Sequence, residues 1–305
     1  MVEIFLYTAA PRQIIGIESE GVMSIAENNR DDATGNYTDK VSQVKNFQKP
    51  MSSIKHKFLV MSSQGGVGKT SVIVSLAVAL AKKGMKVGLM DVNFQGPDIR
   101  RMLGLEPAVV SNSDKRFLPI PYSDDLKVAS IESLMQDIDE TGGWGKPLKI
   151  SDIRRFISSV SWGSLDYLFV DAPSGPGEGL LTMIRAIPEA KTIIVTAPHK
   201  IGGDHAKNMI NFFRKEKIPI FGWIENMQGF LCQHCGQRLE MFSSGPASRA
   251  IFLLDIPFLG RVPIDPHMVE CADAGDPFID KHLESEVAEA CNLIIEKIMG
   301  GERKW

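Results

Sequence analysis

Residues Gly65 to Thr70 read GGVGKT, a glycine-rich turn that ends in a lysine and a threonine. Glycines let backbone N–H groups curl around phosphate oxygens, and the start of a helix adds a partial positive charge. The Lys69 amine can reach the β- and γ-phosphates of a nucleotide, and the Thr70 hydroxyl can bind Mg²⁺. The motif therefore predicts a phosphate-binding loop. Its nucleotide-binding residues would be Gly65, Gly66, Val67, Gly68, Lys69, Thr70 and Ser71.

Two aspartates stand at the ends of apolar segments, Asp91 after VGLM and Asp171 after DYLFV. In an α/β sheet the carboxyl ends of the strands face the ligand crevice, so both carboxylates are expected beside the loop. Asp171 is suited to hold Mg²⁺, and Asp91 is suited to orient or deprotonate an attacking water. Each aspartate alone could instead be a helix cap or a turn residue.

Cys232 and Cys235 form a C-x-x-C pair, which lets two thiolates converge on one metal or cluster. Structural Zn²⁺ and [4Fe–4S] sites usually take four protein ligands, and a twofold dimer would supply the missing pair. The residues leave four readings open: a shared cluster, a zinc knuckle that His234 could join, a redox dithiol, or two idle thiols. Cys271 and Cys291 are expected to be packing residues.

The elements that must position these residues alternate between short apolar strands and helices, which predicts an α/β fold with a mostly parallel sheet and helices on both faces. The loop GGVGKT then lies between a strand and a helix, and this context disfavours a chance glycine-rich turn. Strands are expected at 57–63, 86–92, 165–173, 192–198, 219–226 and 256–263. Helices are expected at 69–84, 151–160, 179–187, 203–217 and 285–300.

Composition describes an ordinary globular chain of 305 residues, 44% hydrophobic and 23% charged, with a net charge of −3. The charge predicts no nucleic-acid partner, and no apolar run approaches the ~20 residues that span a bilayer. Four cysteines do not make a disulfide scaffold, and the N-terminus has no basic region typical of a signal peptide, so a cytoplasmic location is expected.

Two regions are expected along the chain. Residues 1–56 read as an N-terminal extension, because much of that segment is polar and without periodicity, as in a linker or a mobile arm. Residues 57–300 read as one ATPase domain, with the C-x-x-C pair on an insertion loop at 228–241. That loop is expected between a strand ending near Asn226 and a helix beginning near Gly245.

Over residues 57–280 the chain resembles the Mrp-type iron–sulfur cluster carrier ATPases, a family of MinD-like P-loop proteins with a deviant Walker A motif. Five separated motifs occur in the order of the family. They are GGVGKT, LMDVNFQGPDIRRMLG, WGSLDYLFVDAPSGPGE, IPIFGWIENMQGFLCQHCG and IPFLGRVPIDP.

The resemblance implies a homodimer that binds ATP near its interface, carries a bridging [4Fe–4S] cluster on Cys232 and Cys235, and serves apo iron–sulfur client proteins. It makes Lys69 and Thr70 nucleotide ligands, Asp91 the catalytic aspartate of switch I and Asp171 the Walker B residue that holds Mg²⁺. By matching position, Asn226 would read the adenine edge, and Pro263 and Asp265 would border the base.

This chain departs from the family pattern at several positions. Gln64 stands where the family has a lysine that reaches the phosphates of the partner subunit, so the resemblance implies ATP binding with weakened hydrolysis. Arg100 or Arg101 could supply the missing cation. The other departures are Ser63 for glycine, Asn93 for an acidic residue and Asp98 for serine.

Two other functions compete with the carrier. A positioning or partition ATPase of the MinD and ParA kind would bind membranes or DNA, yet the C-terminal segment before its last few residues is mostly acidic rather than basic and amphipathic. A nucleotide-gated electron donor similar to the nitrogenase iron protein would use cysteines far apart in sequence, and the C-x-x-C spacing disfavours it.

Overall fold

The computed structural model describes residues 51–94, 96–106, 116–134, 150–175, 177–198, 200–231, 235, 237–239 and 255–301. Cys232, His234, Gly245 and residues 1–50 of the expected extension therefore lie outside the described residues.

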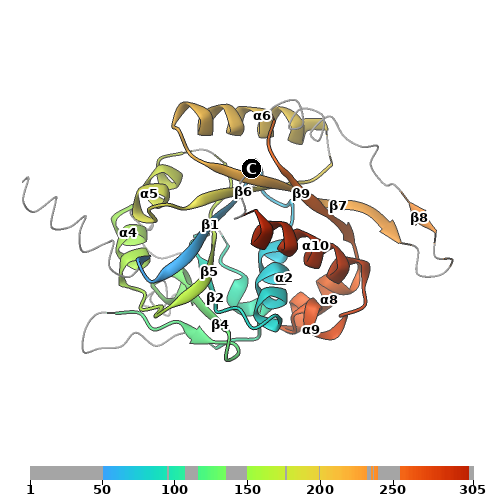
Figure 1. Cartoon of the computed structure of the whole chain (residues 1–305), viewed down its shortest axis with the longest axis horizontal. Coiled ribbons are helices and arrows are strands. Elements are labelled where there is room, and N and C mark those ends of the chain that lie inside the picture. The colour runs from blue at the N-terminus through green and yellow to red at the C-terminus, as the bar shows by residue number, and fades with distance from the viewer. Residues whose placement is uncertain are drawn as a thin grey trace, which may run out of the picture. The chain divides into compact units, whose positions relative to one another are not determined.

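The sheet confirms the predicted fold class (Figure 1). Within the described residues its order is β3-β4-β2-β5-β1-β6-β7-β8, and β9 pairs with β7. Neighbours from β4 to β7 run parallel, as do β7 and β9, whereas β3 and β8 pair antiparallel. The strands are β1 (Ile54–Ser62), β2 (Val87–Asp91), β3 (Ile120–Pro121), β4 (Leu126–Ser130), β5 (Leu165–Asp171), β6 (Lys191–Thr196), β7 (Ile220–Leu231), β8 (Arg238–Leu239) and β9 (Phe258–Ile264).

Helices cover both faces of this sheet (Figure 1). One hydrophobic cluster joins α2, α8, α9 and α10 to the sheet, and a second cluster joins α4, α5 and α6 to the opposite face. The helices are α2 (Lys69–Lys82), α3 (Ile99–Met102), α4 (Ile150–Ser159), α5 (Glu178–Ala186), α6 (Lys200–Lys215), α8 (His267–Ala274), α9 (Phe278–Lys281) and α10 (Glu286–Gly300), with a 3-10 turn at Ile131–Leu134.

Strand β1 shows why the central strands read as continuous apolar runs. Phe58 and Val60 belong to the first cluster, whereas Leu59 and Met61 belong to the second. Successive side chains of a strand point to opposite faces, and both faces of this sheet are covered, so all four of these positions are apolar.

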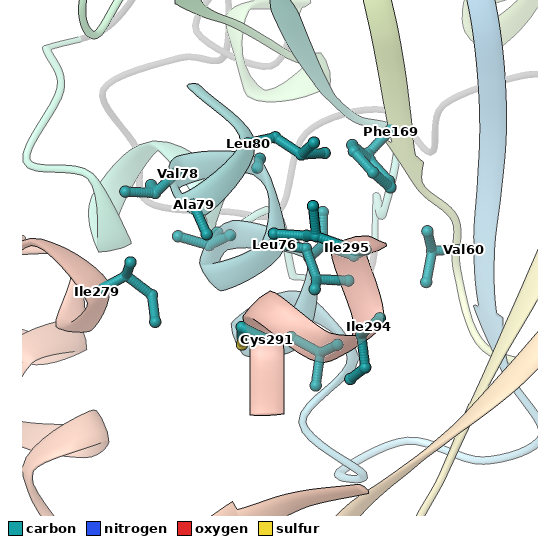
Figure 2. Packing of buried hydrophobic residues seen from close by; sticks show 14 of the residues in the cluster. Val60, Leu76, Val78, Ala79, Leu80, Phe169, Ile279, Cys291, Ile294 and Ile295 are labelled. Atoms are coloured by element: carbon teal, nitrogen blue, oxygen red, sulfur yellow. The ribbon is translucent and has the colours of Figure 1, made fainter. Parts of the chain in front are cut away.

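The helix that follows the phosphate-binding loop is held by the first cluster. Figure 2 shows Leu76 of α2 next to Ile295 of α10, and Leu80 of α2 on the side of Phe169 of the sheet; all four belong to the first cluster. Burying one such aliphatic side chain contributes about 1.5–3 kcal/mol, so the start of α2 is fixed against the sheet. Cys291 lies in the same cluster, fully buried, and Cys271 is also buried, which confirms both as packing residues.

The structure differs from the sequence expectations in several features, and the short elements β3, β8, α3, α8 and α9 were not expected. Strand β1 begins at Ile54, inside the segment expected to be a linker, because Met51 and Ile54 are buried in the core. Strand β4 forms in a stretch that lacked a clear signal, because its sequence LKVAS mixes apolar and polar residues. Strand β7 does not end near Asn226 but continues to Leu231.

Candidate functional site

The phosphate-binding loop connects the end of β1 at Ser62 to the start of α2 at Lys69. Gly66 and Gly68 have φ angles of 77° and 75°, a left-handed conformation that glycine adopts without steric cost. Gly65 and Gly66 are exposed, so the outer side of the loop is open to a ligand.

Lys69, Thr70 and Asp171 meet at the base of the loop. The Lys69 amine forms an ion pair with Asp171 Oδ1, and both side chains are buried. The Thr70 hydroxyl donates a hydrogen bond of 2.7 Å to Asp171 Oδ2. The carboxylate and the hydroxyl are oxygen ligands of the kind that Mg²⁺ prefers, so this pair fits that ion once the Lys69 amine moves to the phosphates.

Asp91 lies next to Asp171, because the two residues are register partners on β2 and β5. Its Oδ1 accepts a hydrogen bond from the Asn93 backbone N–H at 3.0 Å, and its Oδ2 accepts one from Ile99 at 3.1 Å. Complete burial raises the pKa of Asp91 to about 7, against the opposing effect of these two bonds and of Lys69. A carboxyl group with this pKa can act as a base near neutral pH.

The switch segment after Asp91 is held by local bonds. Asn93 also donates from Nδ2 to the Gly96 carbonyl at 3.1 Å, so the residue that replaces the usual acid shapes the turn. Arg100 makes two bonds to Glu132, from Nε at 2.9 Å and from Nη2 at 3.0 Å. Arg101 lies 3.6 Å from the same carboxylate. Both arginines that could replace the missing lysine are therefore paired with Glu132, while Gln64 lies half-buried in the loop.

Asn226 touches the phosphate-binding loop directly. Its Nδ2 donates to the Val67 carbonyl at 2.8 Å, and the side chain is buried. Sequence reasoning expected Asn226 at the adenine edge and missed this bond, because its partner lies 159 positions away. Pro263 is buried in β9, beside the strand that carries Asn226. Asp265 accepts a hydrogen bond at 3.0 Å from the His267 backbone N–H, where α8 begins.

Sequence reasoning did not single out Ser174, which follows β5. Its Oγ lies 4.0 Å from the position that a Cβ would take on Gly65, so Ser174 borders the loop. The signal for it was its place in the glycine- and proline-rich segment just after Asp171.

Cys235 lies in the turn between β7 and β8, and the helix expected near Gly245 lies outside the described residues. Strand β8 pairs antiparallel with the end of β7, where Phe230 faces Leu239 and Leu231 faces Arg238. In Figure 1 this hairpin lies at the end of the long β7 ribbon. Cys235 is exposed and carries a free thiol in the turn of the hairpin. An exposed thiol at this position is accessible to a metal or a cluster.

ATP affinity should fall as the pH rises above about 8. Burial lowers the pKa of Lys69 to about 8, whereas phosphate oxygens beside the amine favour its charged form. Below pH 8 the lysine is already charged; above it, each binding event must take up a proton, so affinity drops by up to about tenfold per pH unit. Calorimetry in buffers of different ionisation enthalpy should find close to one proton taken up at pH 9 and almost none at pH 6.5. Equal uptake at both pH values would contradict the prediction.

No helix of the described residues is both long enough and apolar enough to span a membrane. A family model described as ParA: NUBPL iron-transfer P-loop NTPase matches residues 53–299. The iron-sulfur cluster carrier protein of Methanocaldococcus jannaschii is 39% identical over 253 residues, 82% of this chain and 87% of that protein. The human cytosolic Fe-S cluster assembly factor NUBP2 is 34% identical over 254 residues, 82% of this chain and 94% of that protein.

Solved structures show the same fold. A nucleotide-binding protein from Archaeoglobus fulgidus in complex with ADP is similar at 34% identity and a TM-score of 0.64, over 76% of this chain and 91% of that one. The septum site-determining protein MinD of Pyrococcus horikoshii, complexed with Mg-ADP, is 21% identical with a TM-score of 0.57, over 80% of this chain and 96% of that one. At that lower identity the likeness shows the fold alone.

Proposed function

The chain belongs to the ParA family of P-loop NTPases, in its NUBPL iron-transfer form, and from this we propose that it is an ATP-binding carrier of iron–sulfur clusters. The observation that carries the proposal is the exposed Cys235 on the β7–β8 hairpin, at the end of a strand that also touches the phosphate-binding loop. Relatives of the chain named as cluster carriers and cytosolic assembly factors support it. A cytoplasmic location is part of the same proposal.

The cluster would be cargo shared by two copies of the chain. A C-x-x-C pair supplies two thiolates, and a [4Fe–4S] cluster usually takes four, so Cys232 and Cys235 of each copy in a homodimer would complete the ligand set. Cys271 and Cys291 do not offer a substitute, because both are buried in the packed helices. The cluster would then be released to apo iron–sulfur client proteins.

The nucleotide site would bind ATP with Mg²⁺. The backbone of Gly65 to Ser71 would hold the phosphates, with Lys69 on the β- and γ-phosphates and Thr70 and Asp171 on Mg²⁺. The ADP complex of the Archaeoglobus fulgidus relative supports this assignment. The residues proposed beside the base are Asn226, Pro263 and Asp265.

Hydrolysis would depend on Asp91 and would be slow because of Gln64. Asp91 would orient or deprotonate the attacking water, and its burial gives it a pKa suited to that task. Gln64 would reach toward the partner's phosphates without a charge, and Arg100 and Arg101 are both paired with Glu132.

Anaerobic reconstitution with iron and sulfide tests the proposal. The full chain should bind about four iron and four sulfide per dimer, and the double variant Cys232→Ser, Cys235→Ser should bind almost none. Cys271→Ala is the matched control, and it should load as the parent does, because that thiol is buried away from the hairpin.

Two results would overturn the cluster assignment. One is equal iron in the double variant and the parent. The other is a single Zn²⁺ per dimer without sulfide, which would mean a zinc knuckle at the same cysteines. Phosphate release measured in the same samples shows how much ATP the loaded protein hydrolyses.

A further inference from the structure

One strand connects the nucleotide site to the cysteine pair. Asn226, in the middle of β7, donates its 2.8 Å hydrogen bond to the Val67 carbonyl of the phosphate-binding loop. Cys232 follows only six positions further along the chain, directly after β7 ends at Leu231. The same stretch of backbone therefore contacts the loop and leads into the hairpin that carries the cysteines.

The backbone between these two points is irregular. Met227 has a φ of 61°, which L-residues with a side chain rarely adopt, and Gly229 has a φ of 77°. The register with β9 shifts between Asn226 and Phe230. We name residues 226–229 the β7 bulge. A bulge changes the direction of a strand, so its conformation sets where the hairpin beyond it points.

The β7 bulge packs closely on the phosphate-binding loop. A Cβ placed on Gly68 would come within 2.3 Å of Asn226 Nδ2 and 3.5 Å of Met227 Cε. Gly68 is thus tightly packed against both side chains, and a movement of the loop would displace the bulge. Asn226 donates its hydrogen bond to the Val67 carbonyl, and the backbone N–H groups that would bind phosphate are next to this carbonyl in the loop.

The β7 bulge also holds an unsatisfied polar atom. Gln228 Oε1 is buried and has no hydrogen-bond partner among the described residues. A buried acceptor without a donor is unfavourable, and the left-handed Met227 adds backbone strain, so both features raise the free energy of this arrangement of the bulge. Such an element can have a second arrangement of similar free energy.

We propose that the β7 bulge couples the nucleotide to the cysteine pair: phosphate binding at Val67 and Gly68 shifts Asn226 and Met227, and the hairpin with Cys232 and Cys235 changes its position in response. In its effect on cluster release the proposal rests on the proposed carrier function. Coupling of binding free energies is reciprocal, so a loaded cluster changes the affinity for ATP by the same factor, typically about 5–150-fold.

Thiol alkylation in the metal-free full chain tests the coupling without any cluster. The rates at Cys232 and Cys235, read by peptide mass spectrometry, should change at least about fivefold when a non-hydrolysable ATP analogue with Mg²⁺ is added. Light scattering on the same samples records dimer formation, because a dimer interface over the hairpin could by itself protect the thiols.

Met227→Gly distinguishes coupling through the β7 bulge from protection of the thiols by a dimer interface. Glycine accepts the left-handed conformation and removes the side chain that packs on Gly68. The Asn226 bond alone then links the loop to the bulge, and the flexible glycine next to it should transmit little of that movement to the hairpin. The nucleotide effect on alkylation should shrink to less than about twofold, while dimer formation and nucleotide affinity stay within about threefold of the parent. Lys217→Gly is the matched control: Lys217 has a φ of 54° in the turn before β7, and its variant should keep the full effect.

Iron release on addition of the ATP analogue then gives the functional readout in parent and variants. If the parent loads iron but the analogue changes neither its release nor the alkylation rates, the coupling is wrong and the carrier function stands. If the parent loads no iron but alkylation responds through Met227, the carrier function is wrong and the coupling stands. An undiminished response in Met227→Gly overturns the role of the bulge.

Discussion

Gln64→Lys should raise the rate of ATP hydrolysis by roughly 10³-fold, because in the proposed homodimer it would place a charge at the phosphates of the partner subunit. A cation supplied across an interface to the transferring phosphoryl group accelerates hydrolysis by about 10³–10⁵-fold. We expect the low end of that range, since the glutamine amide already offers a hydrogen bond. Steady-state phosphate release with saturating Mg-ATP is the measurement.

The rise should depend on charge and on the dimer. Gln64→Met has a side chain of similar length without charge and should hydrolyse ATP no faster than the parent. The gain in Gln64→Lys should also disappear when the protein is diluted below the concentration at which it dimerises, because the lysine would act on the other subunit. A gain of less than about tenfold, or one that survives dilution to monomers, would contradict the role that we propose for Gln64.

Asp91→Asn should lower ATP hydrolysis by about 10²–10⁴-fold, which is the range for loss of a positioned base. In the parent, kcat/KM should rise about tenfold per pH unit up to pH 7, because the base form exists above the pKa that burial raises to about 7. It should fall again above pH 8, as Lys69 loses its proton. The rising and falling parts of the pH profile of kcat/KM report pKa values of the free protein, and the pKa values of Asp91 and Lys69 given above also belong to the protein without nucleotide.

The asparagine variant provides its own control through nucleotide binding. Asp91 contacts the backbone of Asn93 and Ile99, and in the described structure its side chain makes no hydrogen bond within the phosphate-binding loop. ADP affinity should therefore stay within about threefold of the parent at pH 7. If Asp91→Asn binds ADP normally and still hydrolyses ATP at the parent rate, Asp91 is not the base. If the parent hydrolyses ATP too slowly to measure, the same comparison can be made with Gln64→Lys and the double variant Gln64→Lys, Asp91→Asn.

Much of the nucleotide site could be predicted because its signals are local in the chain. Six consecutive residues, Gly65 to Thr70, carry the loop chemistry, and Asp91 and Asp171 each end an apolar run. Continuous apolar runs indicate strands covered on both faces, and the structure has that arrangement. Strand β4 was missed because its five residues, LKVAS, mix apolar and polar side chains and form no continuous apolar run.

The side-chain contacts inside the site depend on the order of the strands in the sheet, which local patterns do not encode. β2 and β5 become neighbours only in the folded sheet, and this pairing sets Asp91 beside Asp171. Burial in the assembled sheet gives Asp91 its high pKa. The ion pair of Lys69 with Asp171 joins residues 102 positions apart. Burial and proximity of charge are properties of the assembled sheet, so the pKa values of Asp91 and Lys69 could not be predicted from the motif.

The sequence by itself determined the class of fold, the phosphate-binding loop and the presence of a C-x-x-C pair, because each depends on residues that are adjacent in the chain. Only the tertiary structure decided that β7 continues to Leu231, that Cys235 lies in a hairpin, and that Asn226 donates a hydrogen bond to the Val67 carbonyl. The physical reason is that hydrogen bonds between distant segments form only after the two covered faces of the sheet bring those segments together.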